Sequence, residues 1–155
     1  MLKKNLEPSI FLSYCSPEDQ REIQLKEKVF KILVARQYNV IDSANLRPER
    51  FITDKILETI NDADAVVVLA FTRNVATTLG GMSKYGTSPW IHIEATVAYF
   101  LGKPLLLIGD HRLHRHGVFD QNSFPSSRLF INFEEFTSEA YFDMVHSIEL
   151  FLQSY

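Results

Sequence analysis

The amino-acid sequence predicts an α/β fold in which helices cover both faces of a parallel sheet. The main observation is alternation, because short apolar segments with strand character are separated by longer segments with helical periodicity. The clearest strand is Ala65–Ala70, an uninterrupted apolar run that is typical of a strand buried on both faces. The clearest helix is Pro89–Leu101, with Ser88 as its N-cap and Gly102 as its left-handed C-cap.

Four further strands and three further helices complete this pattern. The strands are expected at Ser9–Tyr14, Tyr38–Asp42, Leu105–Ile108 and Leu129–Phe133. The helices are expected after the Ser16-Pro17 cap signal, at Phe51–Asn61 and at Phe136–Leu152, and the segments Phe71–Ser88 and Gly109–Ser127 are expected to be loops. Five strands with right-handed crossovers predict one three-layer, flavodoxin-like domain over residues 1–155, with strand order 2-1-3-4-5.

The composition narrows the possible partners and compartments. The net charge is −3 and the pI is about 5.9, so nothing favours binding to nucleic acid or to an anionic membrane. Cys15 is the only cysteine, which excludes an intramolecular disulfide and fits a reducing compartment. The N-terminal segment carries no long apolar run, so we expect no signal peptide and a cytoplasmic protein.

Glu94 is the strongest candidate for a functional residue. It lies in the helix Pro89–Leu101, which is apolar almost all round, on the same face as Trp90 and Ala98. A carboxylate there is costly unless it has a partner or a chemical role, and the alternative is a solvated position or an ion pair at the rim. The predicted topology places this helix beside the crevice between the first and third strands, where sheets of this type bind ligands.

Several motifs in order resemble those of the Toll/interleukin-1 receptor (TIR) domain, and the resemblance runs from Ser9 to Gln153. They are the first strand Ser9–Tyr14 with its Ser-Tyr ending, Val40-Ile41-Asp42 followed by Leu46, the third strand Ala65–Leu69, Ser88–Glu94 followed by Gly102-Lys103-Pro104, and the closing segment Phe133–Gln153. The helix motif, an aromatic residue followed four positions later by glutamate, is similar to that of the enzymatic TIR branch.

The resemblance implies an NAD+ nucleosidase or ADP-ribosyl cyclase that releases nicotinamide and forms ADP-ribose or a cyclic derivative. NAD+ would be the substrate, and no cofactor would be needed. Glu94 would be the catalytic carboxylate, which stabilises an oxocarbenium-like state. The implied substrate-binding residues are Trp90, Ser13, Tyr14, Cys15, Asp42 and Leu46. For Trp90 the alternative role is packing in the core.

The resemblance also implies partners and a biological context. A single TIR domain of this size is similar to the signal-producing proteins of bacterial Thoeris-type antiphage immunity, which act through a nucleotide signal on a separate effector. Self-association through TIR–TIR contacts is expected, with Ser43–Arg50 completing a neighbour's pocket. Two alternatives stay open: a non-enzymatic TIR adaptor, and a nucleoside deoxyribosyltransferase-like enzyme, which shares the sheet, a helical glutamate and glycosidic chemistry.

A cluster of histidines has the composition of a metal site but not its surroundings. His111, His114 and His116 alternate with Arg112 and Arg115, and the two guanidinium groups would repel a cation. We therefore predict that the protein binds no metal ion at this segment.

Overall fold

The computed structural model describes residues 7–46, 54–77 and 79–155. The strands are β1 (Ser9–Tyr14), β2 (Asn39–Asp42), β3 (Ala65–Ala70), β4 (Asn74–Thr77), β5 (Ser83–Gly86), β6 (Leu105–Asp110) and β7 (Ser127–Ile131). The helices are α1 (Gln20–Ala35), α2 (Asp54–Asp62), α3 (Pro89–Phe100) and α4 (Ser138–Gln153), with short 3-10 turns at Ser43–Asn45 and Gly117–Phe119.

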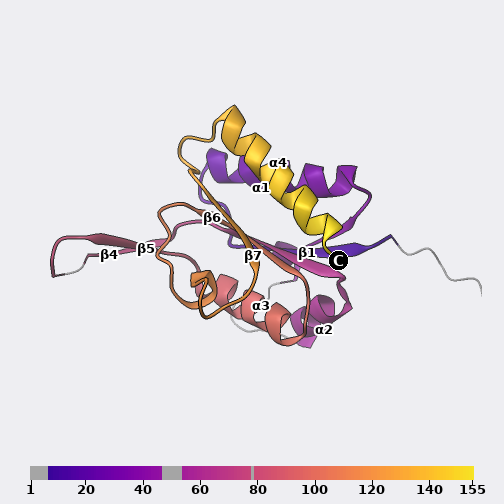
Figure 1. Cartoon of the computed structure of the whole chain (residues 1–155). Helices are drawn as coiled ribbons and strands as arrows, with labels where there is room; N and C mark the ends of the chain where they lie inside the picture. Colours follow the sequence, from indigo (N-terminus) through magenta and orange to yellow (C-terminus); the bar gives the residue numbers. More distant parts are fainter. Residues whose placement is uncertain (1–6, 47–53, 78) are drawn as a thin grey trace, which may run out of the picture.

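The main sheet is parallel and has the order β2-β1-β3-β6-β7 (Figure 1). This is the predicted order 2-1-3-4-5 when the strands of the main sheet are counted along the chain. The direction of strand addition reverses between β1 and β3, which pair from Ile10 with Ala65 to Tyr14 with Leu69. The predicted flavodoxin-like α/β fold is therefore confirmed.

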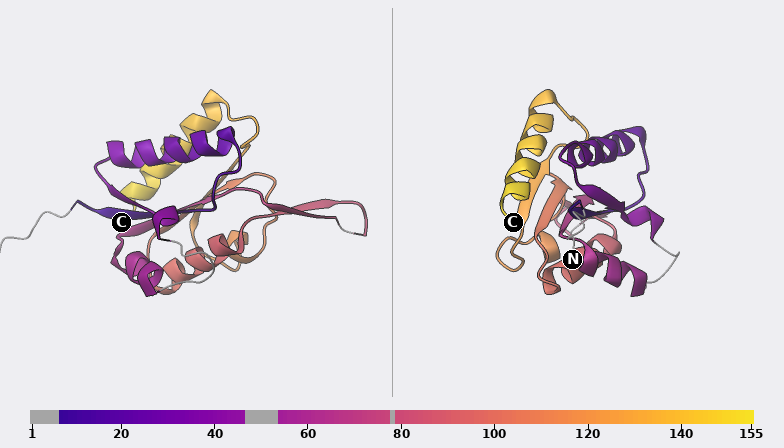
Figure 2. Two further views of the ribbon diagram at one scale, coloured as in Figure 1. Left: turned by 180° about the vertical axis from the view of Figure 1, so that it is seen from behind. Right: turned by 90° about the vertical axis from the view of Figure 1, so that its right-hand side faces the viewer.

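Helices α1 and α4 cover one face of the sheet, and α2 and α3 cover the other (Figures 1 and 2). Because neighbouring side chains of a strand point to opposite faces, β1 contributes Leu12 to the core under α1 and α4, and Phe11 to the core under α2 and α3. The sheet therefore lies between the two cores, and its central strand, β3, is buried at every position.

The ends of α3 follow the predicted caps. The Ser88 hydroxyl accepts a hydrogen bond from the backbone N–H of Trp90, Pro89 is the first helical residue, and Gly102 has φ +68°. By contrast, α1 begins later than the Ser16-Pro17 signal predicts. Asp19 is its N-cap, because its carboxylate accepts a 2.9 Å hydrogen bond from the Glu22 N–H.

The predicted loop Phe71–Ser88 instead contains an antiparallel hairpin, β4 paired with β5, that projects from the body of the protein (Figures 1 and 2). Both strands are largely exposed, so they lack the alternating burial by which a sequence pattern shows a strand. The sheets are separate, since β4 and β5 pair only with each other within the named strands.

Other boundaries differ by a few residues. Strand β7 begins and ends two residues before the predicted Leu129–Phe133, although Phe133 is buried in the core as expected of an apolar residue there. The first residues of the predicted helix Phe51–Asn61 and the second half of the predicted Ser43–Arg50 loop lie outside the described residues. No helix in the described ranges has the length and apolar character needed to cross a membrane.

Candidate functional site

Ser13 and Glu94 meet between the sheet and α3. The Ser13 hydroxyl donates a hydrogen bond to Oε2 of Glu94, which joins β1 to α3 across 81 positions of sequence. Both residues are fully buried. Ser13 lies next to the carboxyl end of β1, on the strand where the order of the sheet reverses, and this is the part of an open α/β sheet at which ligands bind.

The environment of Glu94 is apolar on its own helix. Its neighbours Ile91, Ala95 and Ala98 are completely buried in the core that α3 shares with the sheet. Glu94 is therefore not at a solvated rim, and that alternative is wrong. A buried carboxyl group is costly without hydrogen bonds, so the Ser13 hydroxyl both offsets this cost and fixes the orientation of the side chain.

Tyr14 and Asp42 form a second polar pair, on the opposite face of the sheet. The Tyr14 hydroxyl lies 2.7 Å from Oδ1 and 2.8 Å from Oδ2 of Asp42, to which it donates. The Tyr14 ring belongs to the core under α1, and Lys26 Nζ lies 5.7 Å from its centre. Asp42 also accepts a 2.9 Å hydrogen bond from the Ala44 N–H, which caps the following turn.

The other predicted substrate-binding residues are divided between the two faces. Cys15 is buried in the core under α1 and α4, with Tyr14, whereas Leu46 is half-buried against the core under α2 and α3. Trp90 is half-buried in the first turn of α3. Of the predicted residues, the structure brings Ser13 into direct contact with Glu94 and holds Tyr14 in a different network.

Sequence reasoning missed an ion-pair network at the carboxyl end of β6. Asp110 is buried and accepts hydrogen bonds from the Arg112 side chain at 2.9 Å and 3.1 Å, while Arg112 also donates to Glu134 at 2.7 Å. The hydrogen bonds from Arg112 to Asp110 raise the pKa of its guanidinium group above the usual value. An acid directly after an apolar strand is the sequence signal that indicates this position.

A second missed pair joins the loop after β3 to α1. Arg73 donates to both oxygens of Glu22 at 2.8 Å, and both side chains are largely buried. Burial alone would lower the pKa of Arg73, but the hydrogen bonds to Glu22 raise it above its usual value. A cavity of about 180 Å³ lies at the same edge and is lined by charged residues of both signs, among them Glu22, Asp110 and Arg112.

Three histidines gather beside the hairpin. The ring centres of His92 and His116 are 5.5 Å apart, and those of His114 and His116 are 5.0 Å apart. His111 is directed elsewhere, with Nδ1 3.5 Å from Asp110. Over the described parts of the chain, no group of three or more histidine, cysteine, aspartate or glutamate side chains is arranged to hold a metal ion.

Comparisons with known proteins give a fold and no family. No protein-family model and no curated protein matches the chain. The solved structure of the CMP N-glycosidase BcmB from Clostridium botulinum is similar, with a TM-score of 0.56 at 14% identity, over 92% of this chain and 98% of that one. A conserved protein from Enterococcus faecalis V583 has a TM-score of 0.54 at 12% identity, over 94% and 99% of the two chains.

A 2-deoxyribosyltransferase from Bacillus psychrosaccharolyticus is also similar, with a TM-score of 0.49 at 18% identity, over 86% of this chain and 95% of that one. The TIR resemblance is wrong: no family model supports it, and the similar solved structure BcmB is a CMP N-glycosidase. The expected context of Thoeris-type antiphage immune signalling is withdrawn with it. At such identities, the likenesses to BcmB and to the Enterococcus protein establish the α/β fold alone.

Proposed function

We propose that this protein cleaves the N-glycosidic bond of a nucleoside or nucleoside monophosphate, with Glu94 acting at the anomeric carbon. The observation that carries the proposal is the buried Glu94 carboxyl group, held by the Ser13 hydroxyl next to the carboxyl end of β1. The similarity in fold to a CMP N-glycosidase supports the same bond type. The nucleoside deoxyribosyltransferase-like hypothesis is thereby preferred to the NAD+ nucleosidase hypothesis.

The chemistry follows from the charge that develops on the sugar. When the bond from C1′ to the base nitrogen breaks, its electron pair leaves with the base, which takes up a proton, and positive charge spreads over C1′ and the ring oxygen. A carboxylate stabilises this charge, or forms a bond to C1′ that is broken in a second step. Water then gives the free sugar, whereas a second base gives a new nucleoside. Neither route requires a cofactor.

Ser13 would position the carboxylate. Its hydrogen bond to Oε2 of Glu94 holds the carboxyl group in one orientation toward the sugar. Because Glu94 is completely covered in the structure, the proposed reaction also requires the groups above it to move when the substrate binds.

The experiment is a substrate panel with release of free base measured by chromatography. The panel contains cytidine 5′-monophosphate, cytidine, 2′-deoxycytidine and NAD+, each with and without a second base as acceptor. We expect release of base from at least one cytidine compound, and loss of that activity in Glu94→Gln. Release of nicotinamide from NAD+ alone would favour the other hypothesis. A panel in which every compound stays intact, with correctly folded protein, would contradict the proposal.

A further inference from the structure

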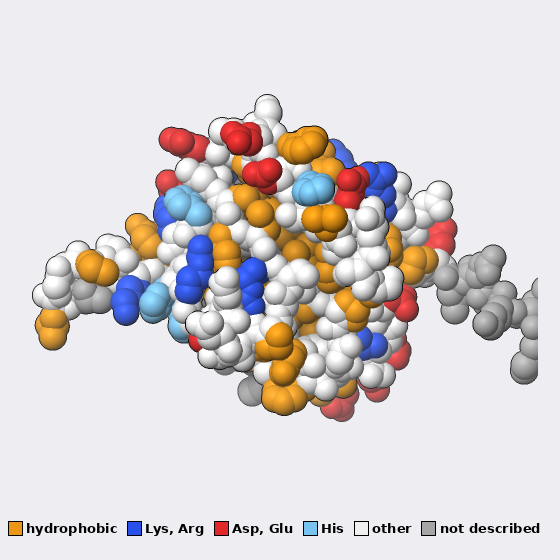
Figure 3. Space-filling model, viewed as in Figure 1, with side chains coloured by type: hydrophobic (Ala, Val, Ile, Leu, Met, Phe, Trp, Pro, Cys, Tyr) orange, Lys and Arg blue, Asp and Glu red, His pale blue; other side chains and the backbone are white. Residues whose placement is uncertain are grey.

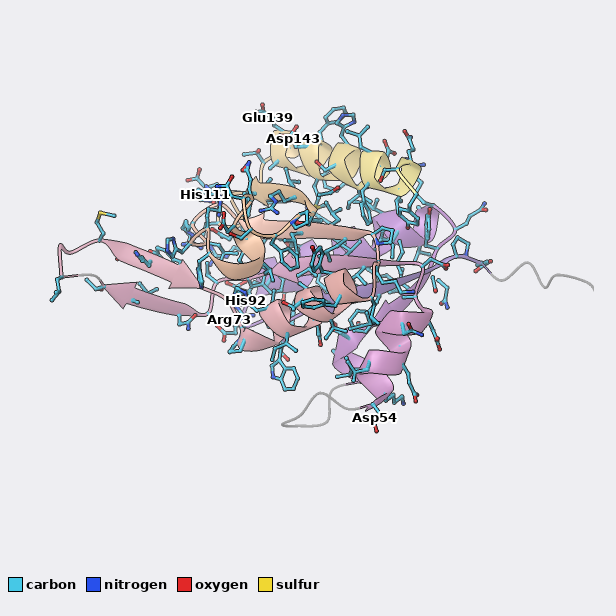
Figure 4. The ribbon with its side chains drawn as sticks, turned by 60° about the horizontal axis from the view of Figure 1, so that its bottom comes forward. Asp54, Arg73, His92, His111, Glu139 and Asp143 are labelled. Atoms are coloured by element: carbon cyan, nitrogen blue, oxygen red, sulfur yellow. The ribbon has the colours of Figure 1, made fainter. Side chains whose placement is uncertain are left out.

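A second cavity, larger than the first, lies between the hairpin, the start of α3 and the loop that follows β6. Its volume is about 710 Å³. In Figure 4, His92 is seen on α3 at the side from which the hairpin leaves, and Figure 3 shows basic and histidine side chains together at the base of the hairpin. Its lining residues include Thr87, Lys84, His92, His114, His116 and Ile93.

Backbone contacts hold the two walls of this cavity together. The His114 N–H donates a 2.9 Å hydrogen bond to the Tyr85 carbonyl, and Tyr85 forms a parallel bridge with Leu113. Arg112 packs over the Tyr85 ring, with its guanidinium carbon 5.1 Å from the ring centre. The base of the hairpin is therefore fixed to the loop after β6, so the cavity has defined walls.

The histidine rings are also held in place. His92 packs edge-on against Phe119, with ring centres 5.2 Å apart. Gly117, at φ +56°, lies so close that a Cβ there would be 3.1 Å from Nδ1 of His92. His116 Nδ1 is 3.2 Å from the His114 carbonyl, to which it donates, so its Nε2 donates to a ligand when the ring carries a second proton.

The charge of the cavity favours an anion. Lys84 lines it as a cation, the imidazoles of His114 and His116 add ring N–H groups, and no aspartate or glutamate appears among the described residues that line it. By contrast, the 180 Å³ cavity near the carboxyl end of β6 is lined by several acids, among them Asp110. The first turn of α3 adds the positive end of a helix dipole, since Pro89 also lines the cavity.

An unpaired hydroxyl points to a ligand independently of the helix end. Thr87 is only 5% exposed. Among the buried polar side-chain atoms of the described residues, its Oγ1 is the one that has no hydrogen-bond partner. A buried hydroxyl without a partner costs about 1–3 kcal/mol. Thr87 lines the cavity, and a rotation of its side chain about χ1 would bring Oγ1 to an acceptor bound there.

We propose that this cavity binds a phosphate monoester, whose phosphate accepts hydrogen bonds from Thr87, Lys84 and the imidazoles of His114 and His116. The volume exceeds that of a phosphate ion, and Val75, Pro89 and Ile93 offer apolar surface to the organic part of the ester. The site is separate from the Ser13–Glu94 pair, because residues 92 and 94 differ by about 200° around a helix of 3.6 residues per turn.

The test is calorimetric titration of the whole protein with inorganic phosphate, cytidine 5′-monophosphate and cytidine. We expect the monophosphate to bind at least tenfold more tightly than cytidine and than inorganic phosphate. Lys84→Ala and Thr87→Val should each weaken it about fivefold or more, whereas Lys31→Ala, at an exposed position of α1, should not. Thr87→Val should also raise the melting temperature of the free protein, because it removes the unpaired hydroxyl.

The alternative outcomes separate the possible explanations. Equal affinity for cytidine and its monophosphate, or unchanged affinity in both cavity variants, would overturn the proposal. Inorganic phosphate that binds as tightly as the ester would assign the site to the free ion and so overturn the ester. Glu94→Gln should bind the monophosphate as well as the unmodified protein does. The test of this cavity is therefore independent of the proposed glycosidic activity. If the monophosphate loses its affinity only in Glu94→Gln, the anion site does not exist.

Discussion

The Ser13 hydroxyl donates a hydrogen bond to the Glu94 carboxyl group, and neither residue has exposed surface. This contact connects the central part of the sheet with the one helix position at which the apolar pattern of α3 is broken by an acid. Because both partners are buried, a small change at either residue affects the orientation of a single carboxyl group. The effect can be measured as a change in the rate of base release and in the free energy of unfolding.

Glu94→Gln preserves the shape of the side chain and removes its negative charge. If Glu94 acts on the anomeric carbon, the rate of base release should fall about 100-fold or more, as when other electrostatic contributions to a transition state are lost. The melting temperature should stay close to that of the unmodified protein. Glu27→Gln, on an exposed position of α1, is the matched control and should change neither quantity. A Glu94→Gln protein with full activity would exclude this residue from the chemistry.

Ser13→Ala removes the hydrogen bond that orients Glu94. We expect kcat to fall about tenfold and the free energy of unfolding to fall by about 1–3 kcal/mol, the usual effect of deleting one partner of a buried hydrogen bond. Ser43→Ala is the control, since Ser43 is also buried and hydrogen-bonds the Tyr14 backbone on β1. It should lose stability and keep its kcat. Equal kcat losses in the two variants would show that Ser13 acts only through the fold.

Tyr14→Phe tests the pair on the other face of the sheet. It removes the donor to both oxygens of Asp42, so we expect a loss of about 1.5–3 kcal/mol in stability, typical of a hydrogen bond to a charged group. Base release by the folded variant should change less than threefold, because Tyr14 packs under α1 and Glu94 lies under α3. A large loss of activity in a protein of nearly unchanged stability would instead make Tyr14 a substrate-binding residue.

The histidine cluster predicts a loss of stability in mild acid. Burial and the nearby His116 lower the pKa of His92, while desolvation, Lys84, His116 and Arg115 lower that of His114. In the unfolded chain both histidines titrate near pH 6.5, so between that value and their lower folded pKa values the unfolded state binds more protons. Stability should therefore fall as the pH drops through this window.

Thermal unfolding between pH 7.5 and 5 measures this effect, because the carboxyl groups with lowered pKa values, such as Asp19 and Asp120, contribute below that range. His92→Gln should make the melting temperature less dependent on pH than in the unmodified protein. His146→Gln, on an exposed position of α4, is the control. A pH dependence that is identical in all three proteins would contradict the assignment to His92.

The sequence was sufficient to predict the helices and strands whose residue pattern is set by burial. Strand β3 is apolar at every position, and the α3 caps Ser88 and Gly102 are local signals, so both were predicted at the correct residues. Pattern and topology placed Glu94 near the crevice but left a solvated rim position open, so its complete burial is known from the structure alone. Ser13 was predicted only as a substrate-binding residue and not as the partner of Glu94, because a contact between positions 13 and 94 has no local signature.

The missed features depend on contacts that sequence patterns do not record. The hairpin is exposed on both strands. The fold brings Glu134 to Arg112, the close sequence neighbour of Asp110, and so extends their ion pair into a network. The family assignment failed for a related reason. A strand ending in Ser-Tyr and a helix with an aromatic residue before glutamate occupy places in an α/β sheet, and one such fold serves many substrates, so these motifs specify the fold more strongly than the substrate.

The hairpin has a consequence for how this protein can change over evolution. Its ends, Asn74 and Gly86, are paired with each other, and the Arg73 N–H donates to the Gly86 carbonyl at 2.8 Å, so the chain leaves the body and returns at one point. Insertions or deletions beyond that point leave the path from β3 to α3 intact, and loop length itself has only a small free-energy cost. The segment can therefore diversify in length and composition between descendants while the sheet is preserved, which makes it a natural place for one ancestral fold to acquire different ligands.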